Sequence, residues 1–405
     1  MANLPTEIIA LEIFPRLPPT ALLRFKSLNK FFYNLISSQK FIDLHLHYSV
    51  SSSPDQLLKV FFTVKDEQQR LYFLDADSPP RYLSLPPPFC DPTRQLAFVN
   101  SFNGLLCLKS YGFQVKKMMY DWIILNPCTG QISANISSSY EWGPLTELCS
   151  GFGYDRLNDD YKLVVVEYYG YSRKVRVYSM KANSWKCVEN MNMRVHGLEM
   201  LIPVRWASSV LIDNNLLHWL VKYPAEIKLS ISCFNLENEQ WAVNVTLPDF
   251  DVDHLDFDSV IDWGVHDGCL CLSIDNCDTF DVWIMKEYRV QESWTRIPID
   301  VSNGLYRRLI FPNVKGIIEE ILFSITSHLK ETCNVTCYGW YNIRDKTCKI
   351  FELSGAPQWF IPQSLCLRSL VTDFGDCQTK KCKATQVERM KIDNEIKILP
   401  ANLDQ

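Results

Sequence analysis

The sequence lacks an excess of positive charge and lacks long apolar runs. Its 41 Lys and Arg residues are outnumbered by 46 Asp and Glu residues, which gives a formal net charge of −5. Proteins that bind nucleic acid usually carry a basic face, so this balance argues against a nucleic-acid partner. Apolar runs such as Leu163–Val166 are far shorter than the ~18 residues that span a bilayer. We therefore expect no membrane partner, and the first residues show no signal-peptide pattern.

Metal-binding spacing is also missing, although the chain has 15 cysteines. No close pair is a Cys-x-x-Cys, and none is followed by a second ligand pair at zinc-finger spacing. The pairs considered are Cys269/Cys271, Cys333/Cys337 and Cys377/Cys382. An odd number of cysteines leaves at least one thiol free in any disulfide scheme, and an intracellular chain keeps thiols reduced. We expect buried thiols in strands, and neither a metal nor a cofactor.

Signatures of nucleotide and calcium binding are incomplete. Gly151-Phe152-Gly153 lacks the third glycine of a dinucleotide loop, because Arg156 occupies its place. The acidic run at residues 249–258 imitates a calcium loop, but His254 stands where the turn glycine is required. Val260 stands where the bidentate Glu is required. Both segments are better interpreted as turns or loops between strands.

Catalytic motifs are absent as well. The sequence has neither Gly-x-Ser-x-Gly nor His-Glu-x-x-His. His218, beside Trp219 in an expected strand, is interpreted as a hydrogen-bonded buried histidine. A catalytic site can still assemble from distant loops, so a β-propeller enzyme or small-ligand-binding protein with an N-terminal helical cap stays open as the alternative.

The first 48 residues follow a helical pattern that prolines divide into short pieces. A first helix is expected after Pro5, a second at Ala21–Lys26 with Thr20 as its N-cap, and a third from about Leu28 to Ile36. Helices this short are not stable alone, and about 45 residues bury too little surface for an independent core. The segment therefore needs a partner, which is either the rest of the chain or another protein.

After a linker at residues 49–54, the sequence becomes a repeated β unit. In each unit an apolar strand ends in a polar turn, and a Trp or an equivalent residue opens the next strand. The clearest copies run from Val175 to Trp185, from Ile231 to Trp241 and from Asp281 to Trp294. Further copies have Arg81, Gln131 and Lys349 at the position of the Trp.

The spacing of these positions predicts the architecture. They occur at residues 81, 131, 185, 241, 294 and 349, at intervals of 50 to 56 residues. A period near 50 residues with several short strands per unit is typical of propeller blades. The sequence therefore predicts a mainly β protein: a small N-terminal α unit followed by a β-propeller-like domain of about six blades. We interpret Trp185, Trp219, Trp241 and Trp294 as structural residues between blades.

The N-terminal residues resemble an F-box, a three-helix motif. The matching stretches are Leu4-Pro5-x-Glu7-Ile8, Ile13-Phe14-x-Arg16-Leu17-Pro18, Leu22 to Leu28 with Lys30, and Phe32-x-x-Leu35-Ile36 with Phe41. Asn29 and Phe32 depart from the family, which usually has Cys and Trp there. The resemblance implies docking on the Skp-type linker of a Skp–cullin–F-box ubiquitin ligase. It also implies that the apolar residues of the motif either build the small helical unit or face that linker. The residues predicted for the linker contact are Leu4, Pro5, Ile8, Ile13, Leu17, Pro18, Leu22, Leu23, Phe25, Leu28, Phe32, Leu35 and Ile36.

The body is similar to the plant F-box-associated domain, which is kelch-like. The similar stretches are Ser101 to Cys107, Leu125 to Gly130, Gly151 to Asp155, Asp160 to Val164, Val177 to Trp185 and Leu217 to Leu220. The family includes the S-locus F-box subgroup, and nothing in the sequence separates that subgroup from its relatives. In the family this domain captures a protein for ubiquitination and is not a catalyst.

The resemblance implies a division of labour along the chain. Residues 1–48 form the F-box, residues 55–370 form the propeller-like domain, and residues 371–405 form a partly disordered tail. The implied function is a non-catalytic substrate-recognition subunit, bound to the Skp-type linker and through it to a cullin. We expect an unidentified target protein as its other partner, and a location in the cytoplasm, the nucleus or both.

Overall fold

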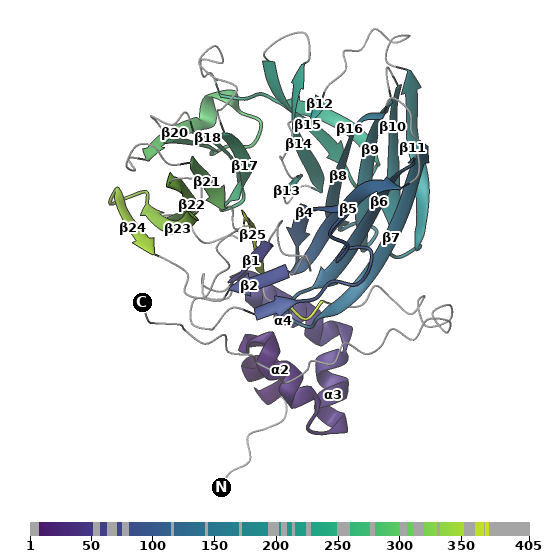
Figure 1. Cartoon of the computed structure of the whole chain (residues 1–405). Helices are drawn as coiled ribbons and strands as arrows, with labels where there is room; N and C mark the ends of the chain where they lie inside the picture. The colour runs from purple at the N-terminus through teal and green to yellow at the C-terminus, as the bar shows by residue number, and fades with distance from the viewer. Residues whose placement is uncertain are drawn as a thin grey trace.

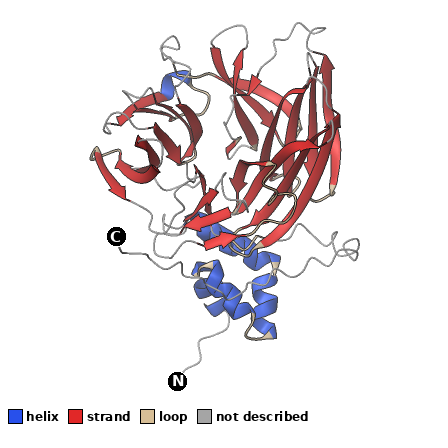
Figure 2. Cartoon of the chain, viewed as in Figure 1, coloured by secondary structure: helices blue, strands red, loops and turns tan. Residues whose placement is uncertain are grey.

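A computed structural model gives the fold of the chain (Figure 1). The residues that it describes are 8–51, 57–62, 71–74, 81–114, 117–141, 145–169, 172–192, 202–203, 209–212, 215–223, 228–248, 260–275, 280–299, 306–310, 320–329, 333–351, 361–367 and 369–371. Apart from one short helical turn among the strands, the described helices gather in one N-terminal region beside a much larger body of strands, as Figure 2 shows. The coarse prediction of a mainly β protein with a small N-terminal helical region is confirmed.

The helical region is residues 8–51. It begins with a π-helical turn, η1 (Ile9–Ile13), and a 3-10 turn, η2 (Phe14–Arg16). Helix α2 (Pro19–Lys26) follows, and the predicted N-cap at Thr20 is wrong because the helix already begins at Pro19. Proline suits the first helical position, where its fixed φ fits and no N–H is needed.

Two further helices complete the region. Helix α3 (Lys30–Ser37) is capped by Asn29, whose side chain accepts a hydrogen bond of 2.9 Å from the backbone N–H of Phe32. Helix α4 (Gln39–Ser51) was not expected as a separate helix, and it enters the segment 49–54 that the composition predicts as a linker. In Figure 1, α4 lies between α2 and α3 on one side and the sheets on the other.

The strands form six antiparallel sheets, which we number in chain order. Sheet 1 contains β1 (Leu57–Phe62), β2 (Leu71–Leu74), β3 (Arg81–Leu83) and β25 (Ile361–Leu367). Sheet 2 contains β4 (Gln95–Phe102), β5 (Leu105–Gln114), β6 (Lys117–Asn126) and β7 (Gln131–Glu141). Sheet 3 contains β8 (Leu145–Asp155), β9 (Asp160–Tyr169), β10 (Ser172–Ser179) and β11 (Ser184–Asn192).

The remaining three sheets follow the same order. Sheet 4 contains β12 (Ile202–Pro203), β13 (Val210–Ile212), β14 (Leu216–Tyr223), β15 (Lys228–Asn235) and β16 (Gln240–Val245). Sheet 5 contains β17 (Val260–His266), β18 (Cys269–Asp275), β19 (Phe280–Met285) and β20 (Trp294–Ile299), with a 3-10 turn, η5 (Gln291–Ser293), before β20. Sheet 6 contains β21 (Tyr306–Ile310), β22 (Glu320–Leu329), β23 (Cys333–Asn342) and β24 (Thr347–Phe351).

The sheets are joined through their innermost strands. These strands contact one another in the cyclic order β25, β4, β8, β13, β17, β21 and again β25. The C-terminal strand β25 pairs with β1 near the start of the β body, so sheet 1 combines strands from both ends of the chain. Apolar clusters fill the space between neighbouring sheets, for example Leu71 with Leu106 and Val164 with Leu217. The sheets therefore have the arrangement of a propeller.

The last two strands of sheets 2, 4 and 6 are joined by a repeated turn. Asn126, Asn235 and Asn342 each end the next-to-last strand, and each side-chain oxygen accepts hydrogen bonds from the backbone N–H groups two and three residues later. These are Asx turns, in which the side chain substitutes for a backbone acceptor. The fourth residue after each Asn has positive φ, and only in the first turn is it a glycine, Gly130.

The described cysteines agree with the sequence interpretation of small residues in strands. Cys107, Cys233 and Cys271 are buried in β5, β15 and β18. None of the cysteines whose side chains the structure describes forms a disulfide.

Candidate protein-binding surfaces and the sites beside them

Large apolar side chains are exposed on the helical region. Leu28 in the turn between α2 and α3 is 65% exposed, and Leu11 in η1 is 56% exposed. On α3, Tyr33 is 54% exposed and Phe31 is 48% exposed. Ile8 and Ile13 are also exposed. Six exposed apolar side chains within so short a segment make this surface a candidate interaction site.

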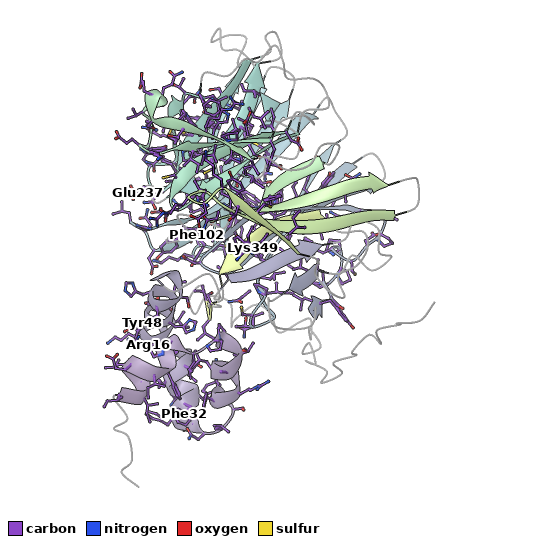
Figure 3. The ribbon with its side chains drawn as sticks, turned by 90° about the vertical axis from the view of Figure 1, so that its left-hand side faces the viewer. Arg16, Phe32, Tyr48, Phe102, Glu237 and Lys349 are labelled. Carbon is purple, nitrogen blue, oxygen red and sulfur yellow. The ribbon has the colours of Figure 1, made fainter. Side chains whose placement is uncertain are left out.

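An aromatic cluster supports this surface from within. The rings of Phe14, Phe25 and Phe32 contact one another, with centroids 5.0 to 6.0 Å apart. Phe32 comes from α3, and Figure 3 shows it at the end of the helical region remote from the sheets. Phe31 stacks edge-on against Phe32, with centroids 5.4 Å apart, and reaches outward. The surface near Phe31 is therefore held by a packed interior.

The structure divides the residues that the sequence assigned to the linker contact. Leu4 and Pro5 lie outside the described residues. The exposed members are Ile8, Ile13 and Leu28. The half-buried members are Leu17, Pro18, Leu23, Phe25, Phe32 and Leu35.

Two assigned residues need correction. Leu22 and Ile36 are 0% and 2% exposed, so they fill the interior of the helical region and offer no surface to a partner. Three other apolar residues of the region, Leu11, Phe31 and Tyr33, are exposed and were not among the predicted contact residues. The adjacent pair Phe31-Phe32 was the available signal, because neighbouring residues on a helix point to different sides.

In the propeller, the four singled-out tryptophans lie between sheets. Trp241 of sheet 4 donates a 2.9 Å hydrogen bond from Nε1 to Glu189 Oε2 of sheet 3, and Trp219 donates to the Ser150 carbonyl of sheet 3. Trp294 of sheet 5 donates to the carbonyl of Thr246, which follows sheet 4. Trp185 of sheet 3 packs on Trp122 of sheet 2, with centroids 6.1 Å apart. Each ring thus contacts the preceding sheet.

A buried lysine ties sheet 3 to sheet 4. The Lys162 ammonium lies 2.8 Å from Asp155 Oδ2, and it donates to the Leu236 carbonyl at 2.7 Å and to Glu239 Oε1 at 3.0 Å. Burial alone would lower the pKa of Lys162, but the hydrogen bonds with Asp155 and Glu239 raise it above its ordinary value. All three ammonium protons are used, so this group is structural.

A second buried polar group lies between sheets 4 and 5. His218 Nδ1 is 3.3 Å from the Val210 carbonyl, and Nε2 is 2.8 Å from the Tyr288 hydroxyl. The carbonyl requires a proton on Nδ1, so the Tyr288 hydroxyl donates to Nε2. Burial lowers the pKa of His218 to about 4. The ring is therefore neutral and engaged on both sides, as the sequence interpretation of a buried, hydrogen-bonded histidine expected.

Within the described part of the chain, no group of three His, Cys, Asp or Glu side chains is placed to hold a metal ion. No helix there is long and apolar enough to cross a membrane.

Comparison with known proteins identifies the family to which the chain is similar. Residues 59–377 match the family described as the F-box associated beta propeller domain. The F-box protein CPR1 of Arabidopsis thaliana is 30% identical over 413 aligned residues, which cover 95% of this chain and 93% of that protein. The Arabidopsis F-box protein At4g22390 is 28% identical, with 73% of this chain and 74% of that protein covered.

The comparison with solved structures gives neighbours at low sequence identity. TolB from Acinetobacter baumannii is 8% identical with a TM-score of 0.46, covering 82% of this chain and 73% of that chain. The family assignment rests on the sequence matches to the family and to CPR1, each of which extends over most of the chain. The chain belongs to the plant F-box proteins that have an F-box-associated β-propeller domain.

Proposed function

We propose that this protein is the substrate-recognition subunit of a Skp–cullin–F-box ubiquitin ligase. The observation that carries the proposal is the exposed apolar surface of the helical region, made of Ile8, Leu11, Ile13, Leu28, Phe31 and Tyr33. In this proposal, the helical region is the F-box and this surface binds the Skp-type linker. The family membership supports the assignment, because the related Arabidopsis proteins are named as F-box proteins.

The helical region carries an excess of basic residues, which indicates the charge of the surface that binds it. Its basic residues Arg16, Arg24, Lys26, Lys30 and Lys40 outnumber its acidic residues Glu12 and Asp43, whereas the whole chain has a net charge of −5. Lys26 also lies over the Tyr33 ring, 5.1 Å from its centroid. We infer that the linker presents an apolar surface with acidic residues around it, so that added salt weakens binding.

The propeller is the part that captures the target protein in this proposal. We propose that each of the six sheets is one blade, and that exposed loops of the ring supply specificity. The chain then contributes proximity and no chemistry: it raises the effective concentration of a target lysine near the ubiquitin-charged enzyme. We also propose a location in the cytoplasm, the nucleus or both, where such ligases act.

The experiment replaces exposed residues only. The double variant Leu28→Asp with Phe31→Asp places two charges in the proposed contact without altering the core of the helical region. Binding of a purified Skp-type linker is measured by calorimetry, and a loss of affinity of at least 100-fold is expected, because central apolar residues dominate such contacts. Leu22 is unsuitable for this purpose, since a charge at a fully buried position unfolds the region itself.

A matched control makes the same chemical change on the propeller. Val243 and Ile350 are 76% and 57% exposed and lie in sheets 4 and 6, so Val243→Asp with Ile350→Asp carries the same added charge outside the apolar cluster that includes α4. This variant should bind the linker like the parent protein. Equal affinity of both double variants and the parent protein would refute the proposed contact.

A further inference from the structure

A short segment close after the last strand, Ser369–Val371, lies between the propeller and the helical region. Strand β25 pairs with β1 in sheet 1, and Ser369, Leu370 and Val371 then continue into the interior. They are 0%, 4% and 7% exposed. In Figure 1 this segment is the short yellow trace beside α4.

Polar groups from two turns of sheet 2, one side-chain amide and one backbone carbonyl, hold this segment. Asn126 donates from Nδ2 to the carbonyls of Ser369 and Val371, at 2.9 and 2.8 Å. The Ser369 hydroxyl donates to the Asn103 carbonyl at 2.7 Å. Asn103 lies in the β4–β5 turn and Asn126 begins the β6–β7 turn, at the same end of sheet 2. The segment is therefore fixed by hydrogen bonds that come from another sheet.

The opposite side of the segment belongs to the core that includes α4. Leu370 and Val371 form one apolar cluster with Phe41 and Ile42 of α4 and with Tyr161 of sheet 3. Asn103 also donates from Nδ2 to the Tyr161 hydroxyl, at 3.0 Å. One short segment thus takes part in the packing of sheet 2, sheet 3 and the helical region.

We propose that Ser369–Val371 is a strap that fixes the helical region to the propeller. The strap begins two residues after the end of β25, the strand that pairs with β1 in sheet 1, so the closing of the ring and the docking of α4 form one cooperative unit. This inference extends the proposed function, because a fixed helical region holds the linker-binding surface at a set orientation to the propeller.

The sharpest test is Asn126→Asp. Aspartate keeps the oxygen that accepts from the N–H groups of Cys128 and Thr129, so the Asx turn is preserved. It loses both donors to the strap and places a negative charge against two carbonyls. The matched control is Asn342→Asp, because Asn342 makes the same Asx turn in sheet 6.

Hydrogen exchange of the full chain, without any partner, gives the readout. A helix of 13 residues is marginal in water, so α4 exchanges faster once it is undocked. Asn126→Asp should speed the exchange of α4 amides about tenfold or more, the effect of losing at least one net hydrogen bond. Asn342→Asp should leave α4 unchanged, and β22 and β23 should exchange equally in the two variants.

A milder variant tests the strap even if Asn126→Asp fails to fold. Ser369→Ala removes the hydroxyl that donates to Asn103 but keeps both carbonyls that Asn126 binds, so a smaller acceleration in the same α4 amides is expected. Unchanged α4 exchange in both strap variants would overturn the strap, as would an acceleration spread evenly over the whole chain. Linker affinity, measured separately, tests the proposed function and not the strap.

Discussion

The helical region and the propeller differ in the apolar surface that they leave to solvent. Of the eleven exposed large apolar side chains among the described residues, six lie between Ile8 and Tyr33. The other five are spread over the much longer propeller, at Tyr82, Leu157, Val243, Val290 and Ile350. Single exposed apolar residues are ordinary, whereas a concentration of them indicates a contact. The exposed apolar surface is therefore concentrated in the helical region, where the proposed function places the contact with the Skp-type linker.

The two regions also differ in how they use charge. The Arg16–Glu12 pair of the helical region is on the surface, with both side chains 61% exposed. Lys162 and Asp155 of the propeller are 6% and 0% exposed, and Lys162 also joins sheet 3 to sheet 4 through Glu239. Exposed pairs add little to stability, whereas breaking a buried pair leaves an uncompensated charge. Removing one partner of these ion pairs should therefore lower the free energy of unfolding strongly in the propeller and only slightly in the helical region.

The largest expected effect is that of Lys162→Met. It leaves Asp155 charged and buried with only its contacts to Asn158 and Leu157, so we expect a loss of ~3–5 kcal/mol in the free energy of unfolding. Urea unfolding followed by tryptophan fluorescence measures this change. The double variant Lys162→Met with Asp155→Asn should recover part of the loss, because Asn keeps the turn and carries no charge.

The control for this prediction is in the helical region. Glu12→Gln removes only the exposed partner of Arg16, and it should change the free energy of unfolding by no more than ~0.5 kcal/mol. A loss below ~1 kcal/mol in Lys162→Met would break the comparison, because the buried pair would then contribute no more than the exposed one.

The second prediction concerns pH. Burial lowers the pKa of His218 to about 4, below the 6.5 of an unfolded histidine, so the unfolded chain binds the proton first as pH falls. Stability is therefore full above pH 6.5 and decreases as pH falls toward about 4. From pH 7 to pH 5 this amounts to roughly 2 kcal/mol. Burial also lowers the pKa of His45 in the helical region, which acts in the same direction.

Two variants separate the histidine from its neighbours. His218→Gln cannot titrate, so the melting temperature should change less between pH 7 and pH 5 than in the parent protein. Tyr288→Phe removes the hydroxyl at Nε2 but leaves the ring buried, so the pH dependence should persist. An unaltered pH dependence in His218→Gln would assign the effect to other groups.

The repeat of the propeller was predictable because it is local. Short strands, polar turns and the residue that opens the next strand recur within each unit, and Gln131, Trp185, Trp241 and Trp294 do lie at the start of β7, β11, β16 and β20. The pairing of β25 with β1 was not predictable. It joins residues about 300 positions apart, and no sequence pattern within either strand specifies the other.

The candidate surface was predictable only in part. A motif places apolar residues on a helix but does not say which face the interior covers. Leu22 and Leu28 have the same side chain but differ in exposure, at 0% and 65%, because Leu22 is within α2 and Leu28 is in the turn after it. Likewise Phe32 packs in the aromatic cluster against Phe14, whereas the neighbouring Phe31 is 48% exposed.

The smallest predicted effect sharpens the comparison within the propeller. Trp241→Phe removes the Nε1 hydrogen bond to Glu189 and much of the ring that lies 4.6 Å from the Arg173 guanidinium. Arg173 still pairs with Glu189, at 2.5 Å, so neither charge is left alone. We expect a loss of about 1–2 kcal/mol in the free energy of unfolding, measured in urea. Val243→Thr, on the same strand but 76% exposed, should stay within about 0.5 kcal/mol of the parent protein. Equal values for the two variants would mean that Trp241 adds nothing between the sheets beyond its place in the strand.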